Sequence, residues 1–196
     1  RTLAHPSRGF IMFARLYKHG LILNEDQNSF IMDYIDGMNQ VVRESGYTFE
    51  IFNYRVESVD SFIEEMIDRK PRGVVILGTE LDVQDVLTLR KLPIPHVVID
   101  TYYEQIATDY VDMANIGAVY DVVEHLYQNG HSRIGMVTSK VKSGNVMMRE
   151  RGFHLAMEQF NLEVGQWPGL EVSPGFMGAY EDMKTLLSKQ VTLPEG

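Results

Sequence analysis

Hydrophobic positions along the chain follow two alternating patterns. Short apolar runs predict strands at residues 9–14, 47–54, 74–77, 96–99, 134–137 and 170–172. Between these runs, apolar residues recur at helical spacing. This spacing predicts helices at residues 30–45, 59–67, 83–92, 116–129, 147–160 and 176–189. Apolar strands alternating with amphipathic helices are typical of a parallel sheet covered on both faces, so the sequence predicts the α/β class.

Two segments suggest how the chain is organised. Residues 100–112 form the one long connection without clear periodicity, and we interpret them as a crossover between two lobes. Residues 193–196 follow a predicted helix, at a point where the alternation would next supply a strand. A sheet that stopped there would have an unpaired edge, which native proteins usually cover. We therefore expect a fragment or an incompletely ordered chain.

Composition excludes several classes of protein. No window approaches the roughly 18 consecutive apolar residues of a membrane span. The balance of 18 basic against 27 acidic residues gives a net charge of −9, so this chain by itself is a poor candidate for nucleic-acid binding. The absence of cysteine excludes disulfides, thiolate metal sites and cysteine nucleophiles. The first residues also lack the apolar run of a secretory signal.

Catalytic and metal-binding motifs are absent as well. The sequence contains no phosphate-binding loop, dinucleotide fingerprint, HExxH, GxSxG or EF-hand spacing. None of its six histidines stands three or four residues from another, so no metal site is expected. We expect no cofactor, and no nucleophile–base pair supports an enzyme. These absences favour a binding protein.

Three segments occur in an order found in a known family. Residues 126–134, LYQNGHSRI, resemble the L-I-x-x-G-H-x-x-I segment of the LacI/GalR (lac repressor) family of transcriptional regulators. Residues 93–100, PIPHVVID, resemble the family segment lpiPvVliD. Residues 149–157, RERGFHLAM, resemble R-x-x-G-F-x-x-A-L. Each segment is weak evidence alone, whereas their ordered combination is specific.

Weaker likenesses extend this resemblance over most of the chain. Gly37 with residues 46–47 resembles GI…GY, and residues 72–76 resemble vDGiIi. The match runs from about Ser7 to the C-terminus. The chain departs from the family at Met113-Ala114, where Asp-Asn is common, so we expect neighbouring Asn115 to cap the following helix instead.

The resemblance implies a two-lobed fold of the periplasmic-binding-protein type, with parallel sheets covered by helices. Residues 1–112 would form the N-terminal lobe and residues 113–196 a partial C-terminal lobe. The family's helix-turn-helix headpiece and hinge helix are absent from this chain. The implied function is ligand sensing and dimerisation in a cytoplasmic transcriptional regulator. Its implied partners are a small effector, first of all a sugar, a second copy of the chain, and operator DNA bound through the headpiece.

Candidate ligand-binding residues follow the predicted strands, because ligands of open α/β sheets sit beyond the carboxyl ends of the strands. Tyr17, Thr79, Asp100 and Tyr102 occupy such positions. Asp100 matches the family's sugar-contacting aspartate and can accept two hydroxyl protons, although it can also cap the next turn. Tyr17, Tyr102 and Phe30 offer flat apolar faces for a sugar ring. Phe30 fits the core stripe of its own helix equally well.

Arg149 is the candidate from the second lobe. It stands near the start of a predicted helix, where the helix dipole disfavours a positive charge. The resemblance implies that the Arg149 side chain reaches the ligand and donates two parallel hydrogen bonds to its hydroxyl groups or to a carboxylate. A salt bridge is the alternative role, and Arg151 is expected to be solvated.

Two other functions remain open at this stage. One is an extracytoplasmic sugar-binding receptor of a transporter, which shares the fold. The GHxxI segment and the absence of a signal sequence favour the regulator. The other is an α/β enzyme acting on sugars or nucleotides, for which the sequence shows no catalytic machinery.

Overall fold

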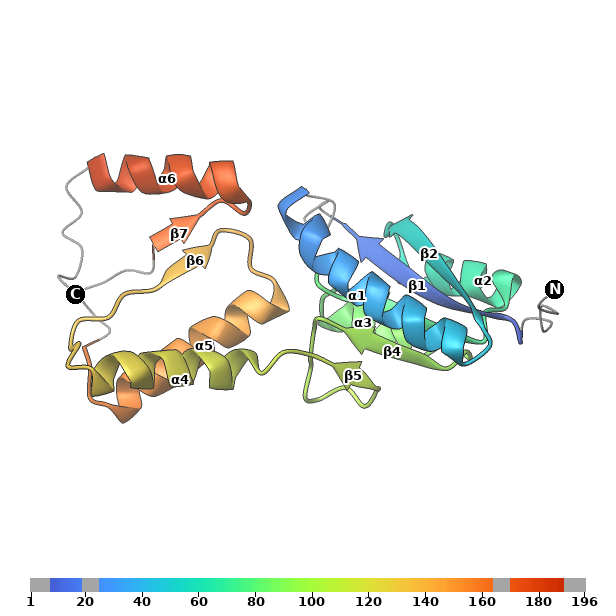
Figure 1. Ribbon diagram of the computed structural model, residues 1–196, viewed down its shortest axis with the longest axis horizontal. Helices are drawn as coiled ribbons and strands as arrows, with labels where there is room; N and C mark the ends of the chain where they lie inside the picture. The colour runs from blue at the N-terminus through green and yellow to red at the C-terminus, as the bar shows by residue number, and fades with distance from the viewer. Residues whose placement is uncertain (1–7, 19–24, 164–169, 189–196) are drawn as a thin grey trace. The chain divides into compact units, whose positions relative to one another are not determined.

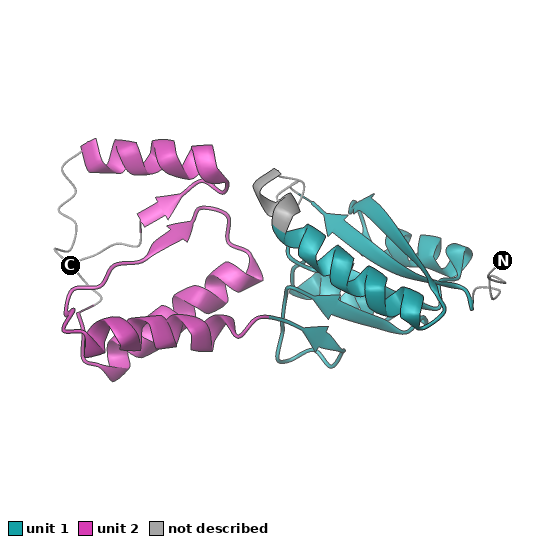
Figure 2. Ribbon diagram, in the orientation of Figure 1, with its two compact units in different colours: residues 1–112 teal, residues 113–196 magenta. Residues whose placement is uncertain are grey.

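The computed structural model describes residues 8–18, 25–163 and 170–188 (Figure 1). The chain divides into two compact units, residues 1–112 and residues 113–196, shown in teal and magenta in Figure 2. Each unit contains a parallel sheet and helices, which confirms the predicted α/β class.

Unit 1 is built on a five-stranded sheet in which every pairing is parallel, with the order β2-β1-β3-β4-β5. Its strands are β1 (Phe10–Tyr17), β2 (Thr48–Arg55), β3 (Gly73–Leu77), β4 (His96–Ile99) and β5 (Tyr110–Val111). Strand β5 lies inside the connection for which no strand was predicted. Two residues are too few to show periodicity, and only their pairing with β4 identifies the strand.

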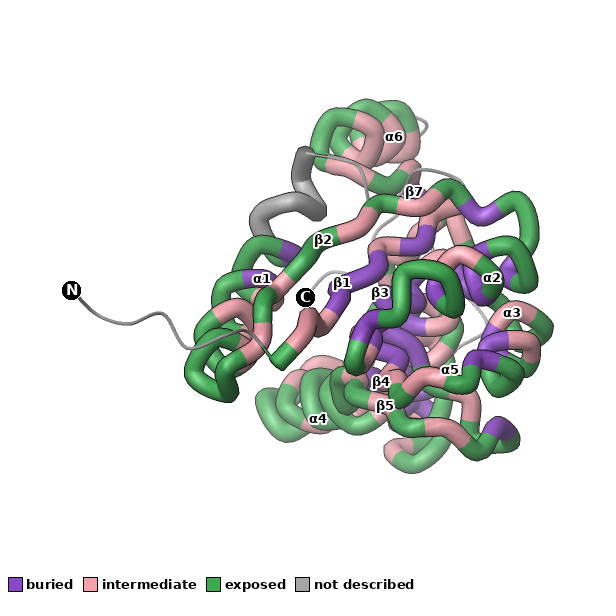
Figure 3. Tube along the Cα trace, turned by 90° about the vertical axis from the view of Figure 1, so that its right-hand side faces the viewer, coloured by how far each residue is buried: buried purple, intermediate pink, exposed green. Residues whose placement is uncertain are grey.

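Three helices cover this sheet: α1 (Glu25–Glu44), α2 (Val59–Arg69) and α3 (Val83–Leu89). Alternate residues of β1 point to opposite faces. Met12, Ala14 and Leu16 pack into the larger core with α2 and α3, whereas Phe13 packs with α1 residues Ile31 and Ile35. Figure 3 shows buried residues concentrated in β1, β3 and β4, while the edge strand β2 is largely exposed.

Unit 2 contains α4 (Asn115–Gln128), β6 (Val137–Ser139), α5 (Gly144–Gln159), β7 (Leu170–Val172) and α6 (Phe176–Ser188). Strand β6 pairs in parallel with β7. The apolar run at 134–137 was predicted to be a strand, but only its last residue is in one. Ile134 instead packs into the core of unit 2 with Val123 of α4 and Phe153 of α5.

Helices α4 and α5 approach each other closely at Gly152. An added Cβ at Gly152 would lie 2.4 Å from the carbonyl oxygen of Ile116 and 3.0 Å from its Cα. Phe153, Ala156 and Met157 then fill the interface beside this contact. The glycine of the R-x-x-G-F segment is therefore required by helix packing.

The predicted capping role of Asn115 is wrong. Ala114 occupies the N-cap of α4 and makes no side-chain cap hydrogen bond. Asn115 is the first residue of the helix and is buried. Its side-chain amide bonds to Asn145 and Arg149 on α5 and to the carbonyl of Met113.

We predict that Gly152→Ala lowers the free energy of unfolding of unit 2 by about 3 kcal/mol or more, because the methyl group clashes with helix backbone. Denaturant unfolding followed by circular dichroism measures this loss. Gly117→Ala on α4 is the matched control, since an added Cβ there meets nothing within 4 Å. It is expected to stabilise the helix by about 0.5–1 kcal/mol. Similar losses in the two variants would contradict the packing argument.

Candidate functional site

Thr79 and Asp100 meet at the carboxyl ends of β3 and β4. The Thr79 hydroxyl donates a hydrogen bond of 2.5 Å to Oδ2 of Asp100, and both side chains are buried. Asp100 has a left-handed backbone with φ of 60°, which is unusual for a residue other than glycine. Its N–H donates to the carbonyl of Val111 at 3.1 Å. Such strain is commonly found at binding sites.

Tyr34 on α1 lies close enough to Asp100 and Asp112 for their charges to act on its hydroxyl. Burial raises the pKa of Tyr34, and the negative charges of Asp100 and Asp112 raise this pKa further. Tyr34 also contacts Phe30 edge to face, with ring centroids 4.8 Å apart. This end of the sheet therefore combines two carboxylates with aromatic rings. Tyr34 and Asp112 were not predicted as site residues, because their spacing along the sequence does not place them beside Asp100.

The three predicted aromatic residues lie in different surroundings. Tyr17 is partly buried against the core under α1. Phe30 is 43 % exposed and is not part of that core. Tyr102 is 41 % exposed and contacts Tyr110 edge to face at 5.3 Å. Phe30 and Tyr102 thus each present an accessible ring.

Lys18 ties the end of β1 to the loop before α3. Its N–H donates to Oε2 of Glu80 at 2.8 Å, and its ammonium group forms ion pairs with Asp82, at 3.0 Å, and with Asp85. Burial alone would lower the pKa of Lys18, but the hydrogen bonds and charges of Asp85 and Asp82 outweigh it and raise this pKa. Burial opposes ionisation of Asp82 too, yet the N–H of Asp85 and the Lys18 ammonium lower its pKa.

Arg149 lies in unit 2 and is held by a buried pair of asparagines. Its Nε donates to Oδ1 of Asn115 at 2.8 Å, and Nδ2 of Asn115 donates to Oδ1 of Asn145 at 3.1 Å. Both asparagines are buried. Within the described residues, the two terminal nitrogens of Arg149 make no further hydrogen bond or ion pair, so this edge of the guanidinium is available. Asn145 was missed because a single asparagine near a helix start gives no sign of burial.

The lysines that follow β6 are neutralised by carboxylates of the same unit. Lys140 pairs with Asp182 at 2.8 Å, and Lys142 pairs with Glu150 at 2.5 Å and with Glu171 at 2.9 Å. Hydrogen bonds from Lys140 and Ser173 hold the pKa of Asp182 well below its usual range. These pairs neutralise both lysines of the loop between β6 and α5, whereas Arg149 on α5 has no acidic partner among the described residues.

Other kinds of site find no support in the part of the chain that the structure describes. Across residues 8–18, 25–163 and 170–188, no three His, Asp or Glu side chains are grouped as metal ligands would be. No helix in these ranges has both the length and the apolar character needed to cross a bilayer.

Comparison with known proteins finds a family and several relatives to which this chain is similar. Residues 17–195 match the family described as periplasmic binding proteins and sugar binding domain of LacI family. The HTH-type transcriptional repressor PurR of Photobacterium profundum is 27 % identical over 150 residues, covering 74 % of this chain and 44 % of the repressor. PurR of Haemophilus influenzae is 25 % identical over 175 residues, covering 87 % and 52 % respectively. The chain thus spans about half the length of the curated relatives it matches.

Solved structures share the fold at low sequence identity. A lac repressor dimer bound to operator and the anti-inducer ONPF has a TM-score of 0.74 at 15 % identity, covering 94 % of this chain and 62 % of that one. A LacI family regulator from Enterococcus faecium with bound ribose has a TM-score of 0.70 at 20 % identity, covering 92 % and 65 %. These likenesses support the periplasmic-binding-protein-like fold.

We predict that Thr79→Val lowers the free energy of unfolding by about 1–3 kcal/mol, because a buried hydrogen bond to a carboxylate is lost. Urea unfolding of both proteins at neutral pH measures the difference. Thr88→Val is the control, since its hydroxyl bonds only to the Gln84 carbonyl within α3 at an exposed position. That substitution is expected to change stability by less than about 0.5 kcal/mol. Equal losses of unfolding free energy in the two variants would show that the Thr79–Asp100 hydrogen bond does not stabilise the fold.

We also predict that Lys18→Met destabilises unit 1 by at most about 1 kcal/mol at pH 7, since the ion pairs are partly exposed. The pKa of Asp82 is lowered in the folded state, so its contribution is present at neutral pH and is lost on acidification through that pKa. The difference in unfolding free energy between Lys18→Met and the parent protein should therefore become smaller below about pH 4. Urea unfolding across pH 3–7 measures it.

Lys91→Met is the control for this measurement, because the Lys91–Asp60 pair is 64 % and 60 % exposed. Lys91→Met is expected to leave the free energy of unfolding almost unchanged. A Lys18→Met effect that does not change on acidification would rule out the ion pairs as its cause.

Proposed function

Because this chain belongs to the family of periplasmic binding proteins and LacI sugar-binding domains, we propose that it is the effector-binding and dimerisation region of a LacI-type transcriptional regulator. Relatives described as HTH-type transcriptional repressors support the regulatory role. The proposal assigns operator binding to a helix-turn-helix headpiece that is not among these 196 residues, and places the regulator in the cytoplasm.

The effector we propose is a sugar bound between an N-terminal lobe, residues 1–112, and a C-terminal lobe, residues 113–196. The buried Thr79–Asp100 pair is the observation that carries this choice. Because Thr79 orients the Asp100 carboxylate, that carboxylate can accept protons from adjacent sugar hydroxyls. Because Lys140 and Lys142 are paired with carboxylates, neither offers a free ammonium group to a phosphorylated ligand, and this favours an uncharged one. A family member with bound ribose is consistent with this choice.

The other candidate residues contact different parts of the sugar in this proposal. Arg149, fixed through its Nε, offers its terminal nitrogens as a fork onto ligand oxygens. In this proposal the exposed rings of Phe30 and Tyr102 supply flat apolar faces for a sugar ring, and the partly buried Tyr17 at the end of β1 supplies a third.

Regulation follows from a shift between two conformations. A ligand that binds the closed arrangement of the lobes more tightly shifts the population toward it. In a two-fold homodimer, that change reorients the N-terminal lobes and sets the spacing of the DNA headpieces. No turnover of the bound sugar is expected, because relatives of this chain are repressors.

A transport receptor of the same fold is the second candidate, since the matching family includes periplasmic binding proteins. The encoded residues upstream of Arg1 distinguish the two proteins. A helix-turn-helix and hinge segment supports the regulator, whereas a secretory signal supports the receptor.

We predict that isothermal titration with ribose, glucose, galactose and sucrose identifies a sugar ligand, and that Asp100→Ala and Arg149→Ala each weaken its binding about tenfold or more. Each substitution removes a charged group that would hydrogen-bond to the sugar. Arg151→Ala is the matched control on α5, because Arg151 is exposed, and it should leave affinity unchanged.

Nucleobases such as hypoxanthine and guanine complete the ligand panel. Binding of a nucleobase without any sugar would contradict the choice of ligand. Sugar binding that survives both Asp100→Ala and Arg149→Ala would contradict the assignment of these residues.

A further inference from the structure

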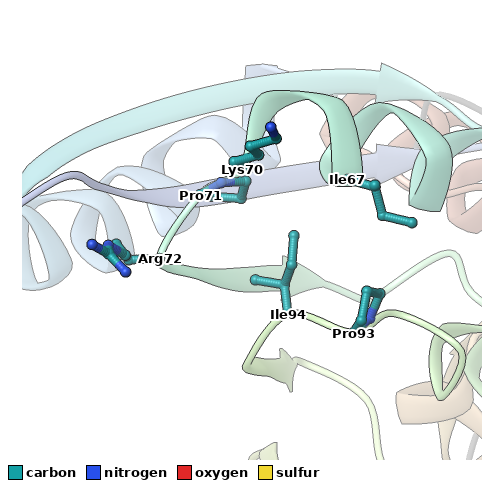
Figure 4. Close-up of a pocket in the computed structure, with 6 residues that line it drawn as sticks. All are labelled: Ile67, Lys70, Pro71, Arg72, Pro93 and Ile94. Atoms are coloured by element: carbon teal, nitrogen blue, oxygen red, sulfur yellow. The ribbon is translucent and has the colours of Figure 1, made fainter.

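A surface pocket of about 480 Å³ lies at the opposite edge of the unit 1 sheet from Thr79 and Asp100. Its lining residues are Ile67, Lys70, Pro71, Arg72, Pro93 and Ile94. Figure 4 shows Ile67 and Pro71, from the end of α2 and just beyond it, opposite Pro93 and Ile94, which precede β4. The pocket therefore lies where β3 and β4 begin. Thr79 and Asp100 follow the carboxyl ends of the same strands. A five-residue strand such as β3 spans roughly 16 Å, so the pocket and the Thr79–Asp100 pair are at least about that far apart.

The walls of the pocket are apolar and offer few backbone donors. Pro71 and Pro93 have no N–H group and a fixed φ, so they form rigid apolar surfaces. Nearby N–H groups are already used: that of Arg72 donates to the Phe10 carbonyl at 2.8 Å, and that of Val74 donates to the Pro95 carbonyl at 2.9 Å. Side chains therefore supply the charged donors at this pocket.

Two cationic side chains at the pocket supply that recognition. Arg72 is held in position, since its Nε donates to the Arg8 carbonyl at 3.3 Å. Its stem lies over Gly9, where an added Cβ would come within 2.9 Å of Arg72 Cγ. Lys70 ends α2 in a left-handed conformation with φ of 54° and ψ of 49°.

Within the described residues, these two cations lack acidic partners of the kind that Arg69 and Lys91 have. Arg69 pairs with Glu65 and Lys91 pairs with Asp60, whereas neither Lys70 nor Arg72 forms an ion pair with any residue in the described ranges. The pocket is thus locally positive on a chain whose net charge is −9. A negatively charged group is complementary to Lys70 and Arg72, whereas the net charge of the whole chain disfavours its non-specific binding.

We propose that this pocket docks an acidic segment of a partner protein. One aliphatic or aromatic side chain of the partner fills the space between the prolines and isoleucines, and flanking carboxylates bind Lys70 and Arg72. A protein fits better than a small organic anion, because five of the six lining residues are exposed or half-buried. Sites for small molecules typically enclose most of the ligand, whereas a partner protein covers an open rim with its own residues.

The test pans a phage-displayed library of random dodecapeptides on the 196-residue chain, followed by fluorescence titration of the synthesised hits. The expected peptides carry Leu, Ile or Phe flanked by Asp or Glu, and Lys70→Glu/Arg72→Glu weakens their binding about tenfold or more. Arg90→Glu/Lys91→Glu is the control, because it makes the same charge change at neighbouring exposed residues that do not line the pocket. It should weaken binding less than about threefold.

Thermal unfolding checks that each variant folds. If the glutamate pair does not fold, Lys70→Gly/Arg72→Gln replaces it, since glycine accepts the left-handed conformation. Sugar binding is titrated in parallel and should be unchanged by the pocket variants, so this proposal and the proposed effector site fail independently.

Four results would overturn the proposal. The first is a library that yields no acidic peptides, and the second is equal weakening by both charge-reversal pairs. The third is pocket-dependent binding of citrate or 1-naphthoate without any peptide, which indicates a small-molecule site. The fourth is light scattering that shows a self-associated chain dissociated by the pocket variant, which indicates a second copy as the occupant.

Discussion

The register between β3 and β4 is the constraint on which the candidate site of unit 1 depends. Leu77 lies opposite Ile99, and the N–H of Gly78 donates to the Ile99 carbonyl at 2.9 Å, so the two strands end at the same level. Thr79 consequently meets Asp100, and β5 supplies the carbonyl that holds the Asp100 backbone. A shift of one residue would exchange Val98 and Ile99 between the two cores and would move Thr79 away from Asp100, so the pairing register sets the geometry of the site.

A comparable constraint operates between the helices of unit 2. The missing side chain of Gly152 lets α5 approach the backbone of α4 at Ile116. This approach brings Asn115 within hydrogen-bonding distance of Asn145 and Arg149, although thirty or more positions separate them along the chain. The arginine is thus oriented by two buried amides that are themselves satisfied, which limits the cost of burying them.

Charge is distributed differently at the two edges of the unit 1 sheet. At the carboxyl edge, the Lys18 ammonium is neutralised by Asp82 and Asp85 beside the candidate effector site. At the amino edge, Lys70 and Arg72 border an apolar pocket and pair with no acidic residue of the described chain. The proposed sugar and the proposed acidic partner would therefore bind at opposite edges of one sheet, where the charges of the surrounding side chains differ.

The sequence by itself determined the α/β class and most of the elements, because burial on both faces of a sheet imposes continuous apolar runs and helices impose a 3.6-residue period. It also determined the family resemblance and the positions of Thr79, Asp100 and Arg149. Only the tertiary structure decided the two-residue strand β5, the late start of β6 at Val137, and the use of Asn115 as a partner of Arg149. It likewise decided that Tyr34 lies within electrostatic reach of Asp100 and that Lys70 and Arg72 border a pocket. These features arise from contacts between residues far apart in the chain, and local periodicity carries no information about such contacts.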